Sequence, residues 1–115
     1  MNSVQRGEVY IVKPDPSIGK EIQKKRMCVI VSSNILNATA GLAIVCPITE
    51  GMGKQADLIH IAILKGEGGS TKDCIVLCEQ VKAVDEERLI EKRGNLRAEI
   101  MHKIDNGLRQ VLSLG

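Results

Sequence analysis

The chain has 115 residues, a length that suits one domain, residues 1–115, with a core of modest size. Hydrophobic residues make up 43% of it, which excludes a disordered chain, and a net charge of +2 is too small to indicate a nucleic-acid partner by itself. With one Tyr and no Phe or Trp, the chain lacks the aromatic platforms on which single-strand binders commonly stack bases.

No segment reaches the roughly 20 apolar residues that span a membrane, and the N-terminus has no apolar signal core. The sequence therefore predicts a cytoplasmic protein without membrane contact. Four cysteines, Cys28, Cys46, Cys74 and Cys78, lie within strand-like apolar runs. Only the last two fit the ligand spacing of a zinc site, and they fit it loosely. We therefore expect buried, reduced cysteines, with no metal site and no cofactor.

In the N-terminal half, β-branched and apolar runs predict strands, and Pro, Asn and Gly mark the loops between them. The predicted strands are residues 8–13, 26–31 and 42–48. A short helical turn is expected at residues 34–40, and flexible loops at 15–25 and 49–53.

In the C-terminal half, residues 58–64 alternate like a strand, and the Gly-rich residues 65–70 predict a connector. Residues 74–84 fit one long strand or two short ones, 85–88 fit a helical turn, and 91–95 are polar. Residues 97–114 change period, because one helical stripe recurs there: Met101, Ile104, Leu108, Val111 and Leu112. Gly107 inside this helix costs about 1 kcal/mol against Ala and is expected to allow close packing.

These elements predict a mainly β fold with helices, in which five to seven short strands form a small barrel or half-barrel closed by a C-terminal helix. Several strands are apolar on both faces. Such a sheet is covered twice, which here suggests its own curl on one side and a second subunit on another.

The sequence contains no P-loop, no Rossmann glycine fingerprint and no H-E-x-x-H motif. His60 and His102 are the two histidines, and either could titrate in catalysis, but isolated histidines are more often packed or solvated side chains. A basic stretch around Lys20, Lys25 and Arg26 runs into the second strand. Basic loops are usually solvated surface, although a guanidinium at a strand end matches phosphate oxygens well.

Arg26 begins one predicted strand and Thr49 follows the next, so the two could meet at one edge of the sheet. An arginine for phosphate charge, a hydroxyl donor and the nearby carboxylate of Glu21 would suit phosphodiester transfer without a metal. A Thr at a strand end is also commonly a turn residue, so the residues alone leave both interpretations open.

An ordered series of motifs covers nearly the whole chain: Arg6-Gly7-Glu8-Val9-Tyr10, Asp15-Pro16-Ser17, Lys25-Arg26, Pro47-Ile48-Thr49, and Leu77-x-Glu79-Gln80-Val81. This series resembles the MazF/PemK/Kid toxins of toxin–antitoxin pairs. The resemblance implies a small SH3-like β-barrel that works as a homodimer. It also implies a sequence-specific, metal-independent endoribonuclease that cuts single-stranded RNA, chiefly mRNA.

The resemblance further implies a cognate antitoxin, whose disordered acidic tail covers the RNA groove and through which DNA is reached only indirectly. Its catalytic residues would be Arg26, Thr49 and Glu21. Its RNA-binding residues would be Lys20, Lys25, Ser33, Gln80 and Arg88. The chain departs from common family patterns at five positions: Tyr10, Ile18, Lys20, Met27 and Leu77.

Two other functions remain open at this point. One is a non-enzymatic binding toxin on the same barrel, like the relative that poisons DNA gyrase, which would not need Arg26 and Thr49 in register. The other is a small barrel adaptor with an incidental basic loop. A short upstream reading frame that encodes an acidic tail would favour the toxin.

Overall fold

The computed structural model describes residues 4–13, 26–50 and 55–115 of the chain. The predicted site residues Lys20, Glu21 and Lys25 lie outside these ranges. The described strands are β1 (Glu8–Val12), β2 (Arg26–Ile30), β3 (Leu42–Glu50), β4 (His60–Ile63), β5 (Cys74–Leu77), β6 (Lys82–Asp85) and β7 (Leu89–Asn95). The helices are α1 (Asn34–Thr39), α2 (Ala98–Leu112) and three 3-10 turns, η1 (Glu67–Gly69), η2 (Cys78–Gln80) and η3 (Glu86–Arg88).

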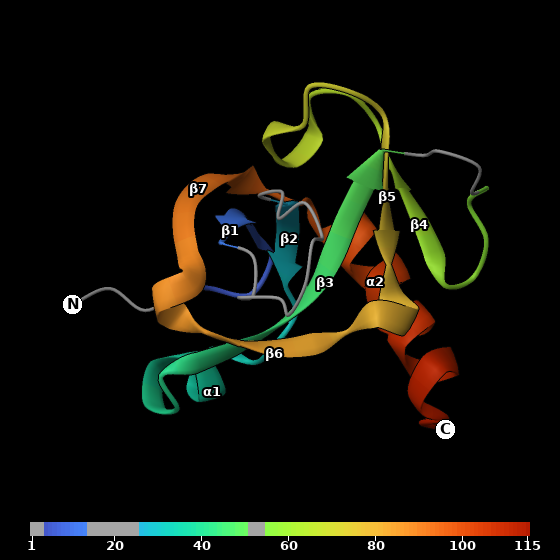
Figure 1. Cartoon of the computed structure of the whole chain (residues 1–115). Coiled ribbons are helices and arrows are strands. Elements are labelled where there is room, and N and C mark those ends of the chain that lie inside the picture. The colour runs from blue at the N-terminus through green and yellow to red at the C-terminus, as the bar shows by residue number, and fades with distance from the viewer. Residues whose placement is uncertain (1–3, 14–25, 51–54) are drawn as a thin grey trace, which may run out of the picture.

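All strands join one antiparallel sheet in the order β4-β5-β3-β2-β1-β7, and β6 pairs with the first half of β3. The long strand β3 crosses the centre of the molecule, with β6 below it and α2 behind it (Figure 1). No pairing joins β4 to β7 within the described residues, so the sheet curls strongly without closing. The predicted half-barrel with a C-terminal helix is confirmed, and a closed barrel is too strict a description.

The sheet buries side chains on both faces, as its doubly apolar strands predict. On one face, α2 packs Ile100, Met101 and Ile104 against β-strand residues such as Val29 and Val76. On the other face, the curl of β6 and β7 encloses a second cluster: Val4, Val12, Cys28, Ile30, Ala43, Val45 and Val84. The curl of the sheet itself therefore supplies one of the two expected covers.

The main differences from the sequence-based expectation concern the end of β3 and the presence of β7. Strand β3 continues to Glu50, so Thr49 lies inside a strand and not at the start of a loop. Residues 74–84 form two short strands separated by η2, which is one of the two forms that the sequence allowed. Strand β7 was not predicted, because its residues Leu89–Asn95 are mostly polar and exposed. It joins the sheet through backbone pairing with β1 at an edge, where charged side chains are tolerated and discourage aggregation.

All four cysteines are buried and free, which confirms their predicted role as small core residues. Among the described residues, no helix is both long and apolar enough to cross a lipid bilayer.

Candidate functional site

Arg26 and Thr49 meet across the β2–β3 ladder. The register pairs Met27 with Ile48 and Cys28 with Pro47, so its continuation by one residue places Arg26 opposite Thr49. Residues opposite each other in an antiparallel pair share a face of the sheet, with Cβ atoms about 4.5–5.5 Å apart. The structure thus brings together the two residues that the sequence could only suggest as neighbours.

This pair lies in one transverse row that crosses the whole sheet. Val12 of β1 pairs with Arg26 on one side and with Leu89 of β7 on the other. Thr49 pairs with Ile75 of β5, which in turn pairs with Ala62 of β4. Because six strands fix this row through backbone ladders, the Arg26 and Thr49 backbones are held by the rigid part of the fold.

The electrostatic state of the pair suits an anionic ligand. Arg26 is exposed, and it makes no ion pair with any residue that the structure describes. Among the residues that the structure describes, the hydroxyl of the half-buried Thr49 donates one hydrogen bond, of 3.3 Å, to the carbonyl oxygen of Glu50. A full positive charge and a hydroxyl donor therefore stand together at the strand edge, where they can bind phosphate oxygens.

Arg88 lies beside the C-terminal end of β1, the end at which Val12 pairs with Arg26. Its Nε and Nη2 donate to the carbonyl oxygen of Lys13 at 3.0 and 2.8 Å, and the Lys13 amide donates to the Arg88 carbonyl at 2.8 Å. Lys13 immediately precedes the segment that carries Lys20, Glu21 and Lys25. The structure therefore places Arg88 beside the chain leading into that segment.

The two remaining predicted residues lie elsewhere. Gln80 is exposed on η2, directly after β5. Ser33 lies beyond the far end of β2 from Arg26, and its hydroxyl caps α1 by accepting from the Leu36 amide at 3.2 Å. The described contacts thus give Ser33 a structural role and leave it apart from the Arg26–Thr49 row.

The sequence analysis did not single out His60 as a site residue, but the structure places it in a well-defined cluster with two carboxylates. His60 Nδ1 lies 2.9 Å from an oxygen of Asp57, and its Nε2 lies 2.8 Å from an oxygen of Glu79. Hydrogen bonds to Glu79 and Asp57 raise the pKa of the imidazole above its ordinary value of 6.5. The sequence held only a weak signal for this cluster, since Asp57 and His60 are close in the chain but Glu79 is distant.

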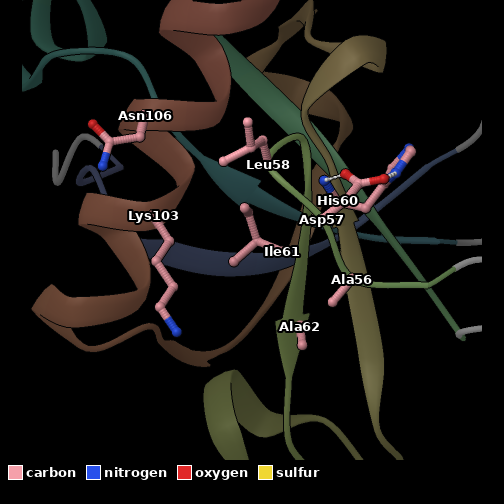
Figure 2. Close-up of a pocket in the computed structure, with 8 residues that line it drawn as sticks. All are labelled: Ala56, Asp57, Leu58, His60, Ile61, Ala62, Lys103 and Asn106. Carbon is pink, nitrogen blue, oxygen red and sulfur yellow. Dashed lines mark hydrogen bonds and ion pairs between the residues drawn. The ribbon is translucent and has the colours of Figure 1, made fainter.

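A pocket of about 380 Å³ lies between β4 and α2 (Figure 2). Leu58, Ile61 and Ala62 line it from the β4 side, and Lys103 and Asn106 line it from the helix. The linked side chains of Asp57 and His60 point away from the helix in this view. Among the described residues that line this pocket there is neither Arg26 nor Thr49, so the pocket is separate from that pair.

The sequence matches a protein family over nearly its full length. A profile described as "PemK-like, MazF-like toxin of type II toxin-antitoxin system" covers residues 5–112. The chain is 32% identical to Endoribonuclease EndoA of Bacillus subtilis (strain 168), over 96% of both chains. It is 34% identical to Endoribonuclease MazF of Staphylococcus epidermidis, over 96% of this chain and 92% of that protein.

Solved structures share the fold. A MazE–MazF crystal structure from Deinococcus radiodurans superposes with a TM-score of 0.81, with full coverage of both chains and 19% identity. An endoribonuclease in complex with its cognate antitoxin, from a mycobacterial species, gives a TM-score of 0.74 at 22% identity, covering 100% of this chain and 98% of that one. At these identities, the superpositions speak for the fold alone.

Proposed function

Because the chain belongs to the PemK-like, MazF-like toxins of type II toxin–antitoxin systems, we propose that it is a sequence-specific endoribonuclease toxin. It cleaves single-stranded RNA, chiefly mRNA, without a metal ion, and a cognate antitoxin neutralises it. The observation that supports the proposal is the β2–β3 register, which runs to Met27 and Ile48 and whose continuation by one residue sets Arg26 opposite Thr49.

The reaction is a transesterification within the RNA. The ribose 2′-oxygen attacks the adjacent phosphorus as the bond to the 5′-oxygen of the next nucleotide breaks. The products are a 2′,3′-cyclic phosphate and a 5′-hydroxyl end. The 2′-hydroxyl proton passes to a general base, for which Glu21 is the candidate, and the leaving 5′-oxygen gains a proton.

Arg26 and Thr49 act on the charge that develops on the phosphate oxygens in the transition state. Donors fixed in advance at such a position contribute roughly 3–4 kcal/mol each. The guanidinium is a planar cation with several N–H donors, so Arg26 works mainly through its charge and its donors. Lys20, Lys25, Gln80 and Arg88 are proposed to hold the RNA around this centre.

The proposed partners follow from the same family membership. An antitoxin with a disordered acidic tail covers the RNA groove, in keeping with the antitoxin complexes among the solved structures. The toxin acts as a homodimer and meets DNA only through the antitoxin complex.

The test uses purified protein, a long RNA of mixed sequence and excess EDTA, with mapping of the new 5′ ends. We expect cuts at one short sequence word, with cyclic phosphate ends. Arg26→Ala should lower the cleavage rate by at least about 10²–10³-fold, and Thr49→Val by a similar factor. A matched substrate with a single 2′-deoxyribose at the cut site should bind but stay intact.

Arg109→Ala is the matched control, because Arg109 is an exposed arginine on α2 that bonds only Asn106 among the described side chains. It should cut like the wild type. Circular dichroism should show that Arg26→Ala keeps its fold. Intact RNA with folded wild-type protein would reject the enzyme and favour a binding toxin, whereas unfolding of Arg26→Ala would make Arg26 a structural residue.

A further inference from the structure

Hydrogen bonds join Asp57, His60 and Glu79 into one cluster. The Asp57 carboxylate accepts the backbone amides of Ile59 and His60, both at 2.9 Å, and also contacts the imidazole. The imidazole is 16% exposed and bridges to Glu79 on η2. Asp57 is therefore held by its own turn and in turn holds His60, whose second ring nitrogen meets the Glu79 side chain, which is 32% exposed.

The cluster lies on the same face of the sheet as Thr49. His60 of β4 pairs with Leu77 of β5. Continuation of the β3–β5 register by one residue sets Leu77 opposite Pro47. Pro47 and Thr49 are two residues apart in β3, so their side chains lie on the same face of the sheet. Glu79 follows Leu77 by two residues and meets His60 on that side. At about 3.3 Å per residue, the four steps along the chain from Ile75 to Glu79 span at most about 13 Å. An RNA held at Thr49 can therefore reach Glu79 within a few nucleotides.

The chemistry of Glu79 suits a base and opposes a phosphate. An ionised carboxylate only accepts hydrogen bonds, and it repels the RNA backbone. Single-stranded RNA is read through splayed bases whose edges are hydrogen-bonded, and glutamate accepts from exocyclic amino groups such as N4 of cytosine. Uracil presents a carbonyl oxygen at that position, which a carboxylate rejects.

We propose that Glu79 reads an amino-bearing base of the RNA close to the cut, and that His60, anchored by Asp57, is the positioning residue that orients its carboxylate. This inference rests on the proposed ribonuclease function and adds a specificity element to it. It predicts that the recognised word contains adenine, cytosine or guanine at the position that Glu79 reads.

The experiment compares cleavage of two short RNAs for each position of the mapped word. One carries the natural base, and the other carries the analogue without its exocyclic amino group: purine for adenine, hypoxanthine for guanine, or 4-deoxyuracil for cytosine. The wild type should favour the natural base at one position by roughly ten-fold or more. Glu79→Gln should bring this ratio close to one, because an amide both donates and accepts.

His60→Asn should flatten the same ratio, mainly through KM, while kcat on the preferred RNA stays within a few-fold of the wild type. Glu99→Gln is the matched control, because Glu99 is an exposed glutamate in the first turn of α2, paired with Arg97. It should leave every ratio unchanged. Circular dichroism and a thermal melt confirm that each variant is folded.

The outcomes separate the two proposals. Cleavage at a defined word, with no position whose base preference changes in Glu79→Gln, overturns this inference and leaves the ribonuclease intact. A changed preference in Glu79→Gln but not in folded His60→Asn overturns the positioning role of His60. A wild-type protein that cuts no RNA overturns the proposed function, and this inference with it.

Discussion

The environment of His60 in the structure differs from the one expected for an isolated histidine. As an isolated histidine in a strand, it was expected to be packed or solvated. In the structure it bridges two carboxylates that are 22 positions apart in the chain, Asp57 and Glu79. Such a bridge favours the imidazolium, because each carboxylate stabilises the protonated ring.

This bridge predicts a pH-dependent stability. The pKa of His60 in the folded protein is raised above 6.5 by Glu79 and Asp57, the two carboxylates that face the ring. Its contribution is therefore fully present below pH 6.5 and is lost as the pH rises through the folded pKa. We expect the unfolding free energy of the wild type to fall over that window relative to His60→Gln, as measured by urea unfolding at each pH.

The comparison with His60→Gln removes the contribution of every other titrating group that the two proteins share. An NMR titration of the imidazole protons should give the folded pKa directly. Parallel stability curves for the two proteins, or an imidazole pKa at or below 6.5, would show that the bridge does not form in solution.

In helix α2, helix propensity and packing predict opposite effects of replacing Gly107 with alanine. Of the predicted apolar stripe of α2, Met101 and Ile104 are buried and Leu108 and Val111 are partly buried. Leu112 is exposed, and the buried Ile100 was not part of the predicted stripe. Gly107 lies on the same buried side. A Cβ atom there would come within 2.8 Å of the Cys78 sulfur and 2.9 Å of the Leu58 carbonyl oxygen.

The substitution Gly107→Ala therefore tests whether helix propensity or tight packing dominates the stability at this position. Helix propensity predicts that alanine stabilises the protein by about 1 kcal/mol. The contact with a backbone carbonyl predicts the opposite, because overpacking a tight interface costs about 1–3 kcal/mol. We expect a net loss of stability in urea unfolding.

Gln110→Ala provides the control on the same helix, because Gln110 is exposed. This change should shift the unfolding free energy by no more than about 0.5 kcal/mol. A more stable Gly107→Ala would mean that α2 can move away from Cys78 and Leu58 without loss.

At the scale of the whole molecule, the described surface leaves several large apolar side chains in water. Ile35 is 80% exposed and Leu58 70% exposed. The full set within the described residues is Ile35, Leu58, Leu64, Ile90, Leu112 and Leu114. Singly exposed apolar side chains also occur on monomeric proteins, so the number of subunits has to be measured directly.

The proposed homodimer makes this point measurable. Gel filtration with light scattering should give twice the 12.5 kDa chain mass at micromolar concentration. Dilution should shift the mass toward the monomer only below the dissociation constant. A mass of 12.5 kDa across the micromolar range would reject the dimer.

The sequence alone determined the features that depend on local pattern. The period of α2, the β-branched runs of β1 to β5 and the burial of the cysteines all follow from residues close together in the chain. The ordered motifs also identified the family. These predictions succeed because a face of a helix or strand is encoded by spacing of 3.6 or 2 residues.

Only the tertiary structure decided which residues face each other. The pairing of Arg26 with Thr49, the bridge of His60 to Glu79 and the contact of Gly107 with η2 all join distant segments. Strand β7 likewise exists because β1 offers it backbone partners, although its own residues are polar. Register and packing are set by contacts between segments, and the local pattern of one segment does not contain its partner.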